Sequence, residues 1–217
     1  MDFDVIIENA SYMLGGLVLS FELAAITLAG GLMLGLVLAL GRLSLKRVIY
    51  YPATVYIYFF RGMPLILVIF WIYFLAPIII QNPVEEFNSA VIAFVTFEAA
   101  YFAEILRAGI QSVPMGQTMA ANASGLNGYQ TVRYIVLPQA LRNMAPALMT
   151  QTVIIFQDTS LAYVIGLREF LRRVNLTDAR EMRSIELYLF AGLVYFLICS
   201  IGVLVSQRLE RKYATAF

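Results

Sequence analysis

Four consecutive polar residues interrupt an apolar stretch near residue 158 and offer the clearest binding chemistry in the chain. They form the run QDTS: Gln157, Asp158, Thr159 and Ser160. Such groups are costly in an apolar helix unless they line a wet cavity or hydrogen-bond to another helix. Asp158 suits an ammonium group, whereas the amide and the two hydroxyls could hydrogen-bond to a carboxylate. The alternative is that these residues join helices of two subunits.

A lone arginine in the run FFRGMP could bind the opposite charge of the same ligand. Gly62 and Pro64 interrupt the helix directly after Arg61, and broken helices expose backbone groups to substrates in many transporters. Arg61 could pair with a carboxylate through two parallel hydrogen bonds. Alternatively, Arg61 reaches the cytoplasmic interface or forms a structural pair with Asp158.

Glu98 is a second isolated charge in apolar sequence. At 100° per residue it shares a helix face with large side chains, so we place it towards a central cavity, where it meets an ammonium group or balances Arg61. The alternative is an internal structural pair. The opposite face should pack against other helices, because small residues allow close approach, and its two charges should pair three residues apart. That face carries Ala99, Ala100, Ala103, Glu104 and Arg107.

The composition excludes several other functions. The 217 residues are 61% hydrophobic and 13% charged, with no histidine and one cysteine, Cys199. A Ser-His-Asp triad, a disulfide and a Cys/His metal site are therefore excluded within this chain, although an intramembrane protease based on aspartate stays open. Neither lysine follows a glycine, so the chain has no phosphate-binding P-loop, and any ATP would have to be bound by another chain. A net charge of +1 gives no support for nucleic-acid binding.

Five apolar blocks are long enough to cross a membrane, which takes about 20 residues. We predict an all-α integral membrane protein with five transmembrane helices. The excess of Lys and Arg in the loops places the N-terminus outside and the C-terminus inside. The blocks are 13–40, a block within 48–80, 89–106, 146–165 and 187–205.

One region fits this orientation poorly. Residues 166–186 carry five arginines and four acids but fall outside. We interpret the region as an external loop with a short amphipathic helix, and a miscounted span is the alternative.

The segment 112–143 between the third and fourth blocks has a helix–turn–helix pattern. Pro114 suits a helix start, and Gly125 to Gly128 should end the helix, because Gly and Asn tolerate the left-handed conformation. A second short helix should follow and break at Pro138. Two short helices that project from the membrane form a shape for docking, although spacing alone also fits a plain loop between spans.

This segment resembles the EAA loop of bacterial ABC importer permeases, which reads Glu-Ala-Ala, three residues, Gly, nine residues, Ile, any residue, Leu-Pro. The chain departs from the pattern only at Met119, where the family usually has Glu. The remaining matches are Ala120, Ala121, Gly125, Ile135, Leu137 and Pro138. In that family the loop is the coupling helix that inserts into a cleft of the ATPase subunit. The residues expected to serve this contact are Gln117, Met119, Ala120, Ala121, Gly125, Tyr129 and Arg133.

The stretches FRGMPLILVIF, AYFAEILRAGIQSVPMGQ and FQDTSLAYVIG look like the polar amino-acid branch of these permeases, and FEAAYFAEILRAGIQS most resembles glutamate/aspartate permeases. The resemblance implies a type I ABC importer permease fold that moves a polar, acidic L-amino acid by alternating access in the bacterial inner membrane. It implies no catalysis or cofactor in this chain, since ATP and Mg would be bound by two partner ATPase chains. A second permease chain and an external binding protein would complete the importer. A self-contained ion-coupled carrier or channel is the alternative.

The same resemblance divides the chain into an external segment 1–12, a permease domain 13–206 and a cytoplasmic tail 207–217.

Overall fold

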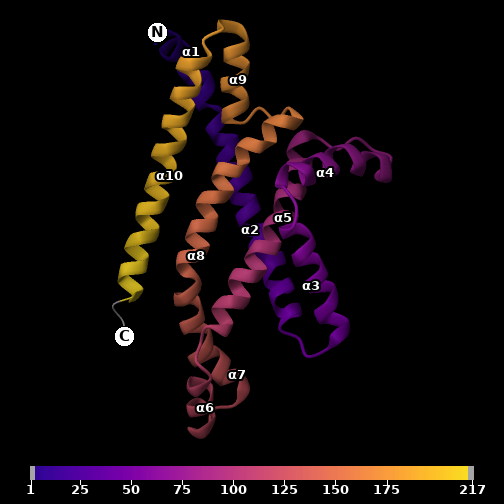
Figure 1. The fold of residues 1–217 in the computed structure, drawn as a ribbon, viewed down its shortest axis with the longest axis vertical. Helices are drawn as coiled ribbons and strands as arrows, with labels where there is room; N and C mark the ends of the chain where they lie inside the picture. Colours follow the sequence, from indigo (N-terminus) through magenta and orange to yellow (C-terminus); the bar gives the residue numbers. More distant parts are fainter. Residues whose placement is uncertain (1–2, 215–217) are drawn as a thin grey trace.

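The computed structural model describes residues 3–214, and every element within that range is helical. Figure 1 shows long helices running side by side, with a small helical protrusion at one end. In chain order the elements are α1 (Asp4–Leu14), α2 (Gly16–Arg42), α3 (Arg47–Arg61), α4 (Leu65–Ile80), α5 (Glu86–Gln111), α6 (Met115–Ala123), α7 (Gly128–Thr131), the π-helical turn η1 (Val132–Val136), α8 (Leu137–Asp158), the 3₁₀ turn η2 (Thr159–Ile165), α9 (Phe170–Glu181) and α10 (Ser184–Ala214).

The pairing of α2 with α5 forms the centre of the fold, because small residues on both helices face each other. Ala99, Ala100 and Ala103 of α5 are fully buried, as the predicted small-residue face requires. A Cβ atom on Gly35 of α2 would lie 2.7 Å from the Cβ of Phe102, so only glycine permits this approach. The prediction that this face packs against another helix is confirmed.

The second apolar block is two helices with a sharp bend between them. The helix α3 ends at Arg61, α4 begins at Leu65, and the two axes differ by 105°. The predicted interruption after Arg61 is therefore confirmed. Extended backbone at Pro64 opens α4, which suits a residue that lacks an N–H to donate.

The prediction of a break at Pro138 is wrong. The helical path continues without interruption from α7 through η1 into α8, and Pro138 lies in the first turn of α8. The N–H of Leu137 bonds to the carbonyl of Val132, five residues earlier, so the turn before the proline is wider than an α-turn. This wider turn accommodates a ring that would clash in a regular helix.

At the end opposite α6 and α7, the helices α1 and α9 lie together beside the start of α10 (Figure 1). The amphipathic helix predicted within 166–186 is α9, and it buries Phe170, Val174 and Thr177. The ring of Tyr12 has two guanidinium groups over it, Arg173 at 5.2 Å and Arg180 at 5.4 Å. Two of the five arginines in this region thus hold α1 against α9 by cation–π contacts.

A buried carboxylate begins α9. Glu169 is fully buried and accepts hydrogen bonds from the backbone N–H groups of Leu171, at 2.9 Å, and Arg172, at 2.6 Å. The hydroxyl of Ser20 on α2 also donates to this carboxylate at 3.4 Å. The arrangement is a helix N-cap that also joins α9 to α2.

Within the part of the chain that the structure describes, three helical stretches are long and apolar enough to cross a membrane: Asp4–Arg42, Glu86–Gln111 and Ser184–Arg208. The bent pair α3 and α4 raises the number to four if it counts as one span. The predicted block 146–165 is helical as α8 and η2, but it is not among these stretches; α8 packs on α2, α5 and α10.

Candidate functional site

Arg61 lies at the end of α3 with 40% of its side chain exposed. Its guanidinium lies 5.6 Å from the centre of the Tyr101 ring, and its Nη1 atom lies 3.6 Å from Oε2 of Glu104. The structural partner of Arg61 is therefore Glu104 rather than Asp158. At that distance the contact is the weakest of those that Glu104 makes, so Arg61 can still bind another anion.

Glu104 joins three helices through arginine side chains. Nη1 of Arg42, on α2, donates to it at 2.7 Å, and Arg107 donates from Nε at 3.2 Å and from Nη2 at 2.8 Å. Arg42 also donates to the hydroxyl of Tyr58 on α3 at 3.0 Å. The predicted pairing of Glu104 with Arg107 is confirmed, and the carboxylate serves the other two arginines as well.

Glu98 lies inside the chain rather than on a surface. Its residue is 1% exposed, and its Oε2 accepts a hydrogen bond from Nε2 of Gln151 on α8 at 2.7 Å. This hydrogen bond agrees with the alternative interpretation of Glu98, in which it forms a structural pair inside the chain. A substrate contact by Glu98 is a proposal that requires α8 to move relative to α5.

The run 157–160 straddles the junction between α8 and η2. Asp158, the last residue of α8, is half-buried and has no cationic partner within 4 Å among the side chains of residues 3–208. Thr159 is fully buried and donates to the carbonyl of Phe156 at 2.7 Å. Gln157 is exposed and faces α10, beside Cys199. Of these residues, Asp158 is the one whose charge is still free to bind a ligand.

Tyr101 lies within electrostatic range of three candidate substrate residues, and of these Arg61 contacts its ring. Tyr101 is close enough to interact electrostatically with Arg61, Glu98 and Asp158, which come from α3, α5 and α8. Arg61 suits the carboxylate of an amino acid and Asp158 suits its ammonium group, whereas Glu98 is already hydrogen-bonded to Gln151. Sequence reasoning missed Tyr101 as a member of this group, as it missed Gln151. The sequence did contain a signal for Tyr101, because it lies one helical turn from both Glu98 and Glu104.

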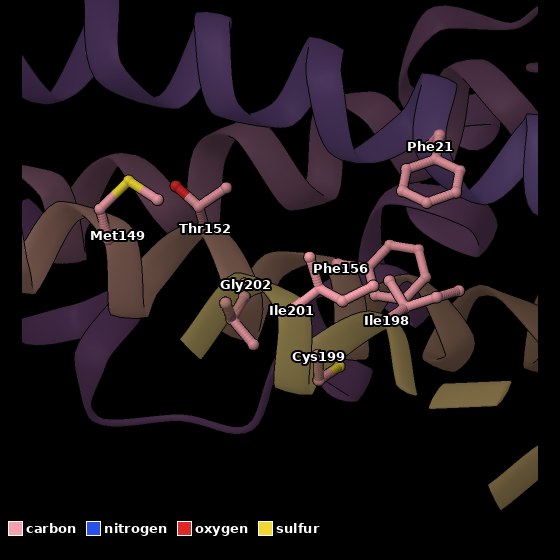
Figure 2. Close-up of a pocket in the computed structure, with 9 residues that line it drawn as sticks. Phe21, Met149, Thr152, Phe156, Ile198, Cys199, Ile201 and Gly202 are labelled. Carbon is pink, nitrogen blue, oxygen red and sulfur yellow. The ribbon is translucent and has the colours of Figure 1, made fainter. Parts of the chain in front are cut away.

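A cavity of about 390 Å³ lies elsewhere, between α2, α8 and α10. Figure 2 shows the rings of Phe21 and Phe156 at one end of it and Met149 at the other. The hydroxyl of Thr152, which also lines it, donates to the carbonyl of Leu148 in its own helix. An amino acid would lose its hydrogen bonds to water in this cavity, so we do not place the substrate there. Among the described residues no group of His, Cys, Asp and Glu is arranged to hold a metal ion.

The coupling segment, residues 112–143, begins with α6 and turns sharply at Gly125. The N–H of Leu126 bonds to the carbonyl of Ala121, and that of Gly125 bonds to Asn122, with Gly125 at φ +86°. This is the left-handed helix ending predicted from the sequence. Asn127 then caps α7 reciprocally with Gln130. The two helical pieces are thus fixed by local hydrogen bonds.

The predicted contact residues of the coupling segment are mostly at its surface. Gln117, Met119, Ala120, Tyr129 and Arg133 are exposed, and so is Gly125. Ala121 is the exception, because it is buried where α6 meets the start of the following helix. Ala121 therefore positions α6, and a direct contact with a partner would involve its neighbours.

Comparisons with known proteins agree with this architecture. Residues 31–215 match the family described as binding-protein-dependent transport system inner membrane component. Glutamate/aspartate import permease protein GltK of Escherichia coli is 40% identical over 220 residues, which cover 98% of each chain. The arginine transport system permease protein ArtQ of Bacillus subtilis is 32% identical, with 98% of this chain and 97% of ArtQ covered.

The solved structure described as an amino acid ABC transporter with histidines is similar over 98% of this chain and 99% of its own, with a TM-score of 0.92 at 28% identity. The MetNI methionine ABC transporter, in an inward-facing conformation, has the same fold, with a TM-score of 0.72 at 15% identity and coverage of 98% and 99%. An ion-coupled carrier finds no support in these matches. The chain belongs to the family of binding-protein-dependent transport system inner membrane components, as an amino-acid permease subunit of an ABC importer whose ATP is hydrolysed by a partner ATPase.

Proposed function

We propose that this permease moves an acidic L-amino acid, of the glutamate or aspartate class, across the bacterial inner membrane by alternating access. The observation that carries the proposal is that Arg61, beside the ring of Tyr101 and only loosely paired with Glu104, can still bind an anion, while Asp158 has no cationic partner within 4 Å among the side chains of residues 3–208. Arg61 would bind a substrate carboxylate and Asp158 the ammonium group. The 40% identity to GltK supports the acidic class.

The remaining polar groups would orient the ligand. Ser160, half-buried beside Asp158, and Gln157 would hydrogen-bond to the substrate as the helices move, and Glu98 would exchange Gln151 for the ammonium group. Thr159 would shape the turn, since its hydroxyl is already bonded within the chain. These roles suit a site that is complete in only one of its two states.

We further propose five spans, with the N-terminus outside and the protrusion inside. The helix α8 would be the fourth span despite its lower apolarity, because α2, α5 and α10 cover it. External residues 1–12, the permease domain 13–206 and a cytoplasmic tail 207–217 follow from this orientation. The side chains of residues 209–217 lie outside those that the structure describes.

One such chain encloses too little for a pathway, so a second permease chain would complete it. Two ATPase chains that bind ATP and Mg would dock on the coupling segments, and an external binding protein would deliver the substrate. Gln117, Tyr129 and Arg133 would contact the ATPase, and Gly125 would set the bend that presents them.

The test is ATP-dependent uptake of labelled glutamate, aspartate, arginine and glutamine by the complete importer in vesicles. We expect competition for uptake by both acidic amino acids and not by arginine. Asp158→Asn should lower uptake while the complex assembles normally. Glu22→Gln, which changes an exposed acid of the α2 helix, is the matched control. Loss of assembly with Asp158→Asn would assign the residue to contacts between subunits instead.

A further inference from the structure

The apolar cavity between α2, α8 and α10 lies at the depth of the membrane. The stretch Ser184–Arg208 is long and apolar enough to cross a membrane, and the cavity-lining residues Ile198 to Gly202 lie six to ten residues before its end. At 1.5 Å per residue, they are about 9–15 Å from Arg208 along the helix. The hydrocarbon core of a membrane is about 30 Å thick, so the cavity lies in the half nearer to Arg208.

The lining of this cavity suits a hydrocarbon chain. Figure 2 shows the aromatic rings of Phe21 and Phe156 together with aliphatic and sulfur-containing side chains. The hydroxyl of Thr152 is already bonded within its own helix, and a thiol is a weak hydrogen-bonding group. A bound water needs several polar partners, which this lining does not supply. Phe21, 49% exposed, and Ile201, 64% exposed, connect the cavity with the apolar outer surface of the helices.

Two arginines lie beyond one end of the cavity, on helix faces that line it. Arg142 of α8 precedes Met149 by seven residues, and Arg208 of α10 follows Ile201 by seven residues. Seven residues turn a helix through about 700°, which is about 20° short of two full turns, and advance it by about 10 Å. Because α8 and α10 run in opposite directions, both arginines lie towards the end of the molecule that carries α6 and α7 (Figure 1).

Both arginines are available to bind an anion at the membrane surface. Each is exposed, and neither forms an ion pair or a hydrogen bond with a side chain of residues 3–208. Close packing of Gly202 on Val153 sets the relative height of the two helices, so the backbones of the arginines differ by about 7 Å in depth. Long arginine side chains can span such a difference. Basic groups between membrane-spanning helices attract anionic lipid headgroups.

We propose that this cavity binds an acyl chain of an anionic phospholipid, whose phosphate pairs with Arg142 and Arg208. Arginine binds phosphate oxygens through parallel, charge-assisted hydrogen bonds. The chain would remove the rings of Phe21 and Phe156 from contact with water or headgroups. The proposed orientation assigns this lipid to the cytoplasmic leaflet, whereas the site itself does not depend on which amino acid is transported.

The first experiment measures lipid binding to the complete importer, purified in detergent and stripped of lipid. Phosphatidylglycerol or phosphatidylcholine with the same acyl chains is added, and bound lipids are counted by native mass spectrometry. Phosphatidylglycerol should bind about tenfold or more tightly than phosphatidylcholine. Arg142→Gln combined with Arg208→Gln should weaken phosphatidylglycerol binding by roughly twentyfold, since each arginine contributes about fivefold. Binding of phosphatidylcholine should stay within about threefold.

The matched control removes the same charge elsewhere on the same side of the membrane. Lys46 and Arg47 are exposed at the start of α3, away from the cavity. Lys46→Gln combined with Arg47→Gln should leave the preference for phosphatidylglycerol within about threefold of the original.

The second experiment tests the acyl chain separately from the headgroup. Ile201→Trp enlarges a side chain at the mouth of the cavity, and the 64% exposure of Ile201 leaves room for it in the folded chain. The substitution should weaken phosphatidylglycerol binding by about fivefold or more with both arginines in place. Leu193→Trp, a 56% exposed position of α10 outside the cavity lining, is the control.

Three results would overturn the proposal. The first is equal binding of the two lipids, or a preference that survives loss of both arginines. The second is equal binding by Ile201→Trp and Leu193→Trp, because the chain would then lie elsewhere. The third is binding to the isolated permease but not to the complete importer, because a second permease chain would then cover the cavity. Asp158→Asn should leave lipid binding unchanged, so failure of the substrate assignment is distinguishable from failure of the lipid site.

Discussion

Removing the charge of Glu104 should separate its structural role from the role of Arg61. Glu104→Gln keeps the size of the side chain and one oxygen acceptor but removes the negative charge shared by Arg42, Arg61 and Arg107. The three arginines come from α2, α3 and α5. Three cations would then lie together without a carboxylate, so the substitution should loosen the joint between these helices.

The geometry sets the size of the effect. Arg42 has 11% of its side chain exposed and lies 2.7 Å from Glu104, and Arg107 makes two further hydrogen bonds to it. Hydrogen bonds to charged groups contribute about 1.5–3 kcal/mol each, and the glutamine would recover about 1 kcal/mol through a neutral bond. The expected loss of stability is about 3 kcal/mol, or about 6–12 °C in melting temperature for a chain of this size. Arg61, exposed and 3.6 Å away, should account for less than about 1 kcal/mol.

The chain supplies its own probe for this measurement. Cys199 is the only cysteine and is 9% exposed, so a dye that becomes fluorescent on reaction with thiols should report unfolding from a single site. Melting curves of the detergent-purified permease would be recorded for Glu104→Gln, Arg42→Gln and Arg61→Gln. Labelled glutamate uptake by the same variants, in the complete importer, would give KM.

We expect Glu104→Gln and Arg42→Gln to lower the melting temperature. Arg61→Gln should leave the melting temperature nearly unchanged and raise KM for glutamate uptake. The reasoning is refuted if Arg61→Gln lowers the melting temperature as much as Arg42→Gln. The reasoning is also refuted if Arg61→Gln leaves KM unchanged, because Arg61 would then contribute neither to stability nor to substrate binding.

Three further changes test individual contacts. Gly35→Ala places a methyl group 2.7 Å from the Cβ of Phe102 and should cost about 1–3 kcal/mol, measured as a lower melting temperature. Asn127→Ala removes the cap of α7 and should cost about 1 kcal/mol locally, seen as faster hydrogen exchange in residues 126–134 while α5 is unaffected. Burial raises the pKa of Glu169 to about 7 from 4.5, so folding takes up a proton between these values. Stability should therefore fall as the pH rises from about 5 to about 7, and Glu169→Gln should flatten that part of the profile, whereas an unchanged slope would assign it to another group.

Local features of the fold were predictable because their causes lie within a few residues. The turn at Gly125 follows from a glycine after a short helix. The end of α3 at Arg61 follows from Gly62 and Pro64. The packing face of α5 follows from alanines at helical spacing, since small residues bring helices together.

Contacts between distant residues were not predictable in the same way. Gln151 on α8 lies 53 residues from Glu98, and no periodicity within α5 indicates which helix supplies the partner of a buried acid. Helical spacing predicted the pair of Glu104 with Arg107, but the participation of Arg42 depends on how α2 crosses α5. The path through Pro138 depended on a π-helical turn, which sequence patterns do not predict.

The continuous path through Pro138 bears directly on how the proposed transport cycle would work. Because α7, η1 and α8 follow one another without a break, a single helical stretch joins the coupling segment at Gly128 to Asp158. At 1.5 Å per residue it is roughly 45 Å long, so a tilt of about 5° at one end displaces the other by about 4 Å. Gln151 lies 23 residues from Gly128, so it would move by about 3 Å, and a movement of that size away from α5 would break its 2.7 Å hydrogen bond to Glu98. A break at Pro138 would have absorbed the tilt near the protrusion, whereas the unbroken helix delivers it to the substrate residues.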